Sequence, residues 1–99
     1  MPYIIETWDK DKHAHVRAEH RNAHLAFLDE NKSLLLACGG KLDDSGTTAS
    51  GGLYIVAFET RQEAEDFIAK DPFSKAGLFK KITVTRWRKA FFDGKSYVK

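Results

Sequence analysis

The chain has 99 residues, a formal net charge of +2 and 42% hydrophobic residues, which predicts one domain over 1–99 and excludes an intrinsically disordered chain. No apolar run approaches the ~18 residues of a membrane span, and the N-terminus lacks the pattern of a signal peptide, so we expect no membrane partner. A single cysteine excludes a disulfide scaffold and a four-cysteine zinc site, and predicts the reducing cytoplasm.

The first two predicted elements are a strand and a long helix. Alternating apolar residues predict a strand from 3 to 8. A stretch without glycine or proline predicts a helix from about 13 to 31, with Asp11 as its N-cap. One face of this helix presents, at helical spacing, Val16, His20, Ala23, His24, Phe27 and Leu28.

Glycine pairs divide the middle of the chain. An apolar run from 33 to 38 predicts a second strand that ends at Gly39 and Gly40. Residues 41–52 are rich in aspartate, serine, threonine and glycine, and therefore predict a loop. A third strand is expected from 53 to 58.

Clear boundary signals mark the next two predicted helices. Thr60 and Glu63 have the spacing of a capping box, and the helix that they open buries Ala64, Phe67 and Ile68. Asp71 precedes Pro72, which ends this helix and predicts a one-turn helix with Asp71 as its N-cap. Beta-branched residues then predict a fourth strand from 79 to 87.

This order of elements, β-α-β-β-α-β, predicts a ferredoxin-like α+β fold with both helices on one face of an antiparallel sheet. The third strand is apolar on both sides, with Leu53, Ile55 and Ala57 on one and Tyr54, Val56 and Phe58 on the other. Two helices cover only one face, so the other would expose a large apolar patch. We therefore expect a homodimer in which two sheets pack into a barrel-like core.

Histidine is the first residue type that could carry chemistry, at positions 13, 15, 20 and 24. His20 and His24 share a helix face, a spacing that suits a metal pair. The intervening residues lack the glutamate of a zinc hydrolase motif, and no third ligand is evident, so no metal is expected. The alternative is that these histidines line the edge of the core.

His24 is the strongest candidate for acid/base chemistry, because it lies on the inward face between apolar neighbours. A histidine in that role needs a carboxylate or carbonyl group to fix its tautomer, and Asp71 is the best candidate. The alternative reading of Asp71 is a helix N-cap alone. Cys38, at the end of an apolar strand, is expected to be a buried small hydrophobe.

The C-terminal end of the chain is basic. Residues 79–99 contain Lys80, Lys81, Arg86, Arg88, Lys89, Lys95 and Lys99 against one acid, Asp93, with Trp87, Phe91 and Phe92 interleaved. This pattern is compatible with single-stranded nucleic acid, but it is also typical of a solvated edge strand. Because the net charge is small, we expect no nucleic-acid partner. Asp93 and Gly94 predict a tight turn in this tail.

From Tyr3 to Trp87 the sequence resembles the YciI-like (YCII-related) family of the dimeric α+β barrel group. The matching segments are Arg21-Asn22-Ala23-His24-Leu25, Leu35 to Gly40, Gly51 to Val56, Thr60 to Phe67, Asp71 to Leu78 and Arg86-Trp87. The family often has Gly-Pro at Gly39-Gly40 and Gly-Ser at Gly51-Gly52. The tail, 88–99, is an extension outside the pattern.

This resemblance implies a ferredoxin-like dimer whose active site is built on His24 and Asp71. Arg21 would hold an anionic oxygen of a small-molecule ligand. The expected substrate-binding wall comprises Phe27, Gly39, Gly40, Phe73, Ser74 and Trp87.

The first functional hypothesis is a small enzyme without a cofactor, which carries out an elimination or isomerisation on a hydroxylated aromatic or enolisable molecule. The second is a non-catalytic module that binds a small ligand or a peptide in the same cleft. The third is a structural dimer that packs on a larger enzyme through its basic tail.

Overall fold

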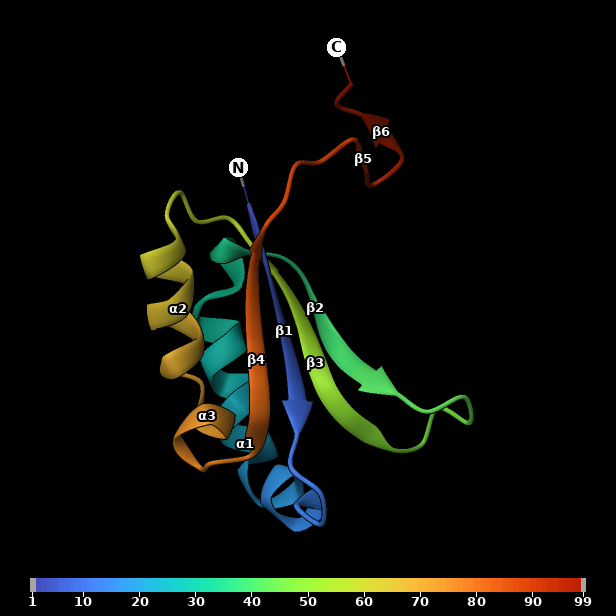
Figure 1. Ribbon diagram of the computed structural model, residues 1–99, viewed down its shortest axis with the longest axis vertical. Helices are drawn as coiled ribbons and strands as arrows, with labels where there is room; N and C mark the ends of the chain where they lie inside the picture. The colour runs from blue at the N-terminus through green and yellow to red at the C-terminus, as the bar shows by residue number, and fades with distance from the viewer. Residues whose placement is uncertain (1, 99) are drawn as a thin grey trace.

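The computed structural model describes residues 2–98 and has an antiparallel four-stranded sheet with the order β2-β3-β1-β4 (Figure 1). The elements are β1 (Tyr3–Asp9), α1 (Ala14–Glu30), a 3₁₀ turn (Lys32–Leu34), β2 (Leu35–Leu42), β3 (Ala49–Val56), α2 (Arg61–Ala69), α3 (Pro72–Lys75), β4 (Phe79–Arg86), β5 (Phe91–Phe92) and β6 (Lys95–Ser96). The ferredoxin-like β-α-β-β-α-β prediction is confirmed. Among residues 2–98, no helix has both the length and the apolarity needed to cross a bilayer.

The core lies between the helices and one face of the sheet (Figure 1). Alternation along β1 directs Tyr3, Ile5 and Thr7 into this layer, where all three are buried. The predicted stripe of α2 is also confirmed, and the buried apolar cluster comprises Tyr3, Ile5, Tyr54, Val56, Ala64, Phe67 and Ile68.

The start of α1 differs from the prediction. Asp11 is not the N-cap: the N-cap position is His13, and no side chain caps the helix. Lys12 adopts a positive φ of 59°, and the main-chain carbonyl of Asp11 accepts a hydrogen bond from His13 Nδ1 at 2.7 Å. The reversal at Lys12 therefore separates the Asp11 side chain from the first turn of the helix.

The predicted stripe of α1 is only half-buried, and Ala23 is exposed. No residue of the helix is fully buried. Phe27 and Leu28 pack against the core cluster, but the part of this face that carries His24 borders an open cavity.

Strands β2 and β3 are longer than predicted. Gly39 and Gly40 do not end β2, which continues to Leu42, and the predicted loop over 41–52 shrinks to residues 43–48. Glycine fits inside β3 because this strand approaches β1 closely. A Cβ atom on Gly51 would overlap the carbonyl oxygen of Thr7, and the amide of Gly52 donates to Thr7 Oγ1 at 2.8 Å.

We expect Gly51→Ala to destabilise the fold by about 2 kcal/mol or more, because the added methyl group meets a main-chain atom that cannot rotate away. Gly39→Ala is the matched control, since no atom of residues 2–98 outside its chain neighbours lies within 4 Å of a Cβ atom at that position. Urea unfolding of both variants measures the difference. Equal midpoints for the two variants would contradict this account of Gly51.

The predicted capping signals at the starts of α2 and α3 are confirmed. The amide of Glu63 donates to Thr60 Oγ1, and the Glu63 carboxylate accepts from the amide of Thr60, which completes the capping box. Asp71 caps α3 by accepting from the amide of Phe73 at 2.9 Å, and Pro72 is the first residue of that helix. The main chain therefore fixes the position of the Asp71 carboxylate.

The tail forms a small hairpin. Asp93 and Gly94 have φ angles of 53° and 73°, as the predicted tight turn requires, and they join β5 to β6. The hairpin lies beyond the end of the main sheet (Figure 1).

Candidate active site

His24 and Asp71, which are 47 residues apart in sequence, are in direct contact. His24 Nδ1 lies 2.9 Å from Asp71 Oδ1 and 3.0 Å from Oδ2. His24 projects from the middle of α1, while Asp71 lies between α2 and α3. The packing of α1 against α3 brings the two side chains together.

Asp71 is fully buried and receives hydrogen bonds from three different groups. Besides His24, the amide of Phe73 donates to Oδ1 and the Tyr54 hydroxyl donates to Oδ2 at 2.9 Å. Burial and the charge of Asp71 raise the pKa of Tyr54, so its phenol keeps its proton and acts as a donor. These contacts lock the carboxylate in one orientation.

The contact with Asp71 sets the tautomer of His24. A carboxylate can only accept, so Nδ1 carries the proton and donates it. The Nε2 atom is then an acceptor with a free lone pair, and no group among residues 2–98 makes a hydrogen bond to it. The His24 side chain keeps 12% of its surface exposed, and it lines the cavity.

The imidazole of His24 is also held by stacking. Its ring lies 4.0 Å from the ring of Phe73, centroid to centroid, with an angle of 17° between the planes. Phe73 is buried at the start of α3, two residues after Asp71. One short segment, Asp71-Pro72-Phe73, therefore fixes both the edge and the face of the imidazole.

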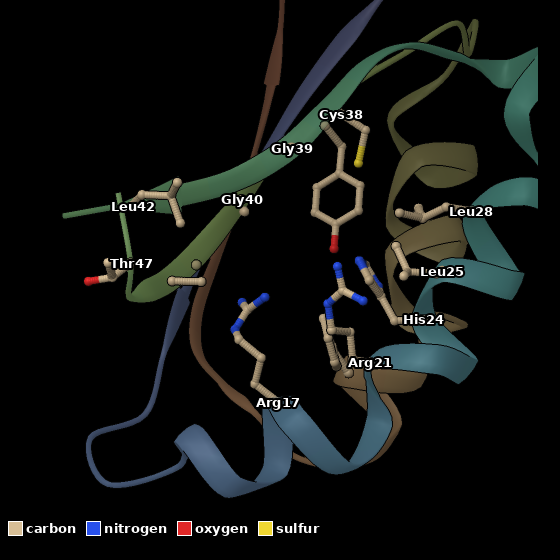
Figure 2. A pocket seen from close by; sticks show the side chains of 15 residues that line it. Arg17, Arg21, His24, Leu25, Leu28, Cys38, Gly39, Gly40, Leu42 and Thr47 are labelled. Atoms are coloured by element: carbon tan, nitrogen blue, oxygen red, sulfur yellow. The ribbon is translucent and has the colours of Figure 1, made fainter. Parts of the chain in front are cut away.

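A cavity of about 440 Å³ opens in front of His24, between α1 and the glycine-rich parts of β2 and β3. Figure 2 shows Arg17, Arg21 and His24 extending from α1 toward this space, with Gly39 and Gly40 on the opposite side. Because four glycines (Gly39, Gly40, Gly51 and Gly52) line it, much of that wall is bare main chain.

The two arginines of the cavity differ in their freedom. Arg17 is bound to Asp9 through Nε at 2.7 Å and Nη2 at 2.9 Å, and its guanidinium lies 4.7 Å from the Phe73 ring centroid. Arg21 lies one turn before His24 and is exposed, and no salt bridge within residues 2–98 engages it. Arg21 is therefore the cation available to an incoming anion.

Cys38 departs from the expectation of a buried residue, because it is exposed. Its sulfur nevertheless points into the cavity (Figure 2), on the face of the sheet that carries its strand partner Tyr54. Loss of water around the thiol, followed by the charge of Asp71, raises the pKa of Cys38 from 9.0 to about 11. A thiol with a raised pKa is a poor nucleophile at neutral pH.

We expect Cys38 to react with iodoacetamide roughly 100-fold more slowly than an ordinary cysteine at pH 8, since its pKa is about two units higher. The rate should continue to rise toward pH 11, where an ordinary thiol has already levelled off. Asp71→Asn should lower this pKa, because the charge of Asp71 is one of its causes. Alkylation of folded protein at the rate seen in urea would contradict the shift.

Three of the residues expected at the site lie away from this cavity. Phe27 packs against Phe67, 5.0 Å between ring centroids, and Trp87 packs against Phe92 in the tail. Ser74 does not line the cavity, and its buried hydroxyl has no hydrogen-bond partner within residues 2–98. The expected residues that do meet here are His24, Asp71, Arg21, Gly39, Gly40 and Phe73.

Two residues that the sequence analysis did not select complete the site. Arg17 lies one helical turn before Arg21, so its position was readable from the helical spacing. Tyr54 gave no such signal, because its hydroxyl meets Asp71, 17 residues later, only in the folded chain. Among residues 2–98, no group of three or more histidine, cysteine, aspartate or glutamate side chains is placed to hold a metal ion.

Comparison with known proteins gives the family. The sequence profile of the YCII-related domain matches residues 1–88, nearly the whole chain. The chain belongs to the YCII-related family. This confirms the resemblance seen in the sequence, and the family match ends where the basic tail begins.

Relatives support the same assignment. Over 98 residues, which cover 92% of this chain and 100% of each relative, it is 32% identical to an uncharacterised protein of Haemophilus influenzae and 31% identical to the protein YciI of Escherichia coli O6:H1. A similar solved structure is the 5-chloro-2-hydroxyhydroquinone dehydrochlorinase TftG of Burkholderia phenoliruptrix, in complex with 2,5-dihydroxybenzoquinone. It has a TM-score of 0.83 and 33% identity, with 89% of this chain and 94% of that chain covered.

Proposed function

We propose that this YCII-related protein is a small enzyme that uses His24 and Asp71 as an acid/base pair, without a cofactor, in an elimination or isomerisation. The observation that carries the proposal is the bond between His24 Nδ1 and the buried Asp71, which leaves Nε2 as a base in the cavity. Asp71 would stabilise the imidazolium that forms when Nε2 takes up a proton.

The proposed substrate is a small, planar, hydroxylated aromatic or enolisable molecule. The bare glycine wall fits a flat ring, and Arg21 is free to bind a phenolate or enolate oxygen. TftG, named as a dehydrochlorinase of a hydroxyhydroquinone, is the relative that points to this class. At 33% identity to TftG, the proposed substrate of this chain is the same class of ring and not the same compound.

The proposed elimination uses only side chains. Nε2 of His24 removes a proton from an O–H or C–H group of the substrate, and that electron pair forms a C=O or C=C bond. The leaving group departs as an anion with the electron pair of its own bond. The imidazolium of His24 then releases its proton to that anion or to water, so the net products are the unsaturated ring, the leaving group and one proton. For an isomerisation, the imidazolium returns the proton to another atom of the same molecule.

A panel of small molecules tests this proposal: chlorinated and unchlorinated hydroxyhydroquinones, phenols and lactones. Chloride release and ultraviolet absorbance of the ring report turnover, while a thermal shift reports binding. Turnover of at least one compound supports the enzyme. Binding without turnover by any of them would instead favour the non-catalytic ligand-binding module.

We further propose that the protein functions as a homodimer joined through the open face of its sheet. Leu53 is 39% exposed on that face, next to the half-buried Ile55 on the same strand. Leu53→Asp should place a charge in the proposed interface and raise the monomer fraction in sedimentation at micromolar concentration. An unchanged sedimentation profile would exclude this face as the interface. The cytoplasmic location stays a prediction that depends on the single cysteine.

A further inference from the structure

The C-terminal hairpin arm, residues 88–98, leaves large side chains uncovered. Phe91 is 69% exposed and Val98 62% exposed. Strands β5 and β6 pair only with each other within residues 2–98, and a lone two-stranded hairpin is marginally stable in water. The arm therefore needs a surface to pack against.

The arm holds its exposed side chains away from the rest of its own chain. Trp87 fixes its base, because the Trp87 amide donates to the Pro2 carbonyl at 2.9 Å and its ring meets Phe92 edge to face. Figure 1 shows the hairpin past the end of the sheet and on the side away from α2. Its surface thus faces outward, where another molecule can meet it.

A complementary surface exists elsewhere on the same chain. A hollow of about 520 Å³ between the end of α1 and α2 has Phe27, Phe58 and Phe67 in its wall and Glu30, Glu63 and Asp66 beside them. The residues that line the hollow include three acids and two bases, whereas the arm has three bases and one acid. The two lysines of the hollow, Lys70 and Lys75, lie at its α3 end.

We propose that the hairpin arm docks into the α1–α2 hollow of a second copy of this chain. Aromatic side chains of the arm would meet the aromatic wall, and its lysine and arginine side chains would meet the acids of α2. The open sheet face is a poorer acceptor, because Lys41 on it is already paired with Glu6, and Lys81 beside Trp8 leaves it no excess of acids for a basic arm. Each copy has one arm and one hollow, so two copies can exchange arms in a closed pair or link larger assemblies.

Photo-crosslinking of the full chain tests where the arm docks. A benzophenone amino acid replaces Phe91, and light and isotopically heavy copies are mixed before irradiation. We expect mixed light–heavy crosslinks from position 91 to α2 or the end of α1, and none from the exposed control position Ser50. Crosslinks to the sheet face, to co-purified nucleic acid or to another protein, or an absence of crosslinks, would overturn the proposal.

Charge exchange gives a second, independent test. Lys95→Glu and Asp66→Lys should each weaken self-association in sedimentation by roughly two- to fivefold. Combining them should restore the association, because opposite charges again face each other. Phe91→Ala should weaken it by roughly tenfold. If the double variant is no stronger than the single variants, the arm does not meet α2. Neither test needs a substrate, so both stand whatever the outcome for catalysis.

Discussion

Replacing His24 by glutamine should reduce turnover by roughly 10²–10⁴-fold, the usual contribution of a general acid/base. Glutamine is polar and can still donate to Asp71, but it cannot accept and return a proton at the position of Nε2. The measurement is the initial rate on any substrate that the panel identifies. Wild type should also show a limb in its pH–rate profile that the variant lacks.

The control for this prediction is His20→Gln, one turn earlier on the same helix. His20 is half-buried on α1 but does not line the cavity, so its replacement should leave the rate nearly unchanged. Circular dichroism and thermal melts establish that both variants fold. If His24→Gln keeps the wild-type rate on a true substrate, the acid/base assignment is wrong.

Replacing Asp71 by alanine should destabilise the protein by about 3 kcal/mol, a fall in Tm of roughly 15 °C. Removal of the carboxylate leaves three donors without their acceptor in a buried place: the Tyr54 hydroxyl, the Phe73 amide and His24 Nδ1. The N-cap of α3 is lost at the same time. Thermal and urea unfolding measure the change.

Two comparisons separate the structural role of Asp71 from its proposed catalytic role. Asp71→Asn can still cap α3, so it should lose less stability than Asp71→Ala. It should nevertheless lose most of the activity, because a neutral amide no longer stabilises an imidazolium. Asp11→Ala removes the aspartate whose side chain does not cap α1, and should change stability by no more than about 0.5 kcal/mol. A large loss there would contradict the observed start of the helix.

Local signals predicted the fold well where they act over a few residues. The capping box at Thr60, the Asp71-Pro72 start of α3 and the Asp93-Gly94 turn each depend on neighbours in sequence, and all three occur as predicted. The strand boundaries predicted from the glycine pairs were wrong for the opposite reason. At Gly51 the requirement comes from the carbonyl of Thr7 on another strand, so a residue typical of turns lies inside β3.

The candidate site also has parts that local spacing predicts and parts that depend on contacts between distant elements. Spacing along one helix placed His24 and Arg21 on related faces. Asp71 was the predicted partner of His24 because of its place before Pro72, and the resemblance to the YCII-related family implied the same pair. Their contact, the hydroxyl of Tyr54 and the bond between Arg17 and Asp9 join different elements. No local pattern encodes those distances, because they depend on how α1 and α3 pack over the sheet.

The sequence by itself therefore determined the order of elements, the family and the chemistry available to the site, since these follow from residue types and short-range spacing. The tertiary structure decided which edge of the His24 imidazole bonds Asp71, which arginine of the cavity forms a salt bridge among residues 2–98, and how far β2 and β3 extend past their glycines. The physical reason is that a hydrogen bond, an ion pair or a close main-chain approach depends on distances of a few ångströms, and only the packed elements fix those distances.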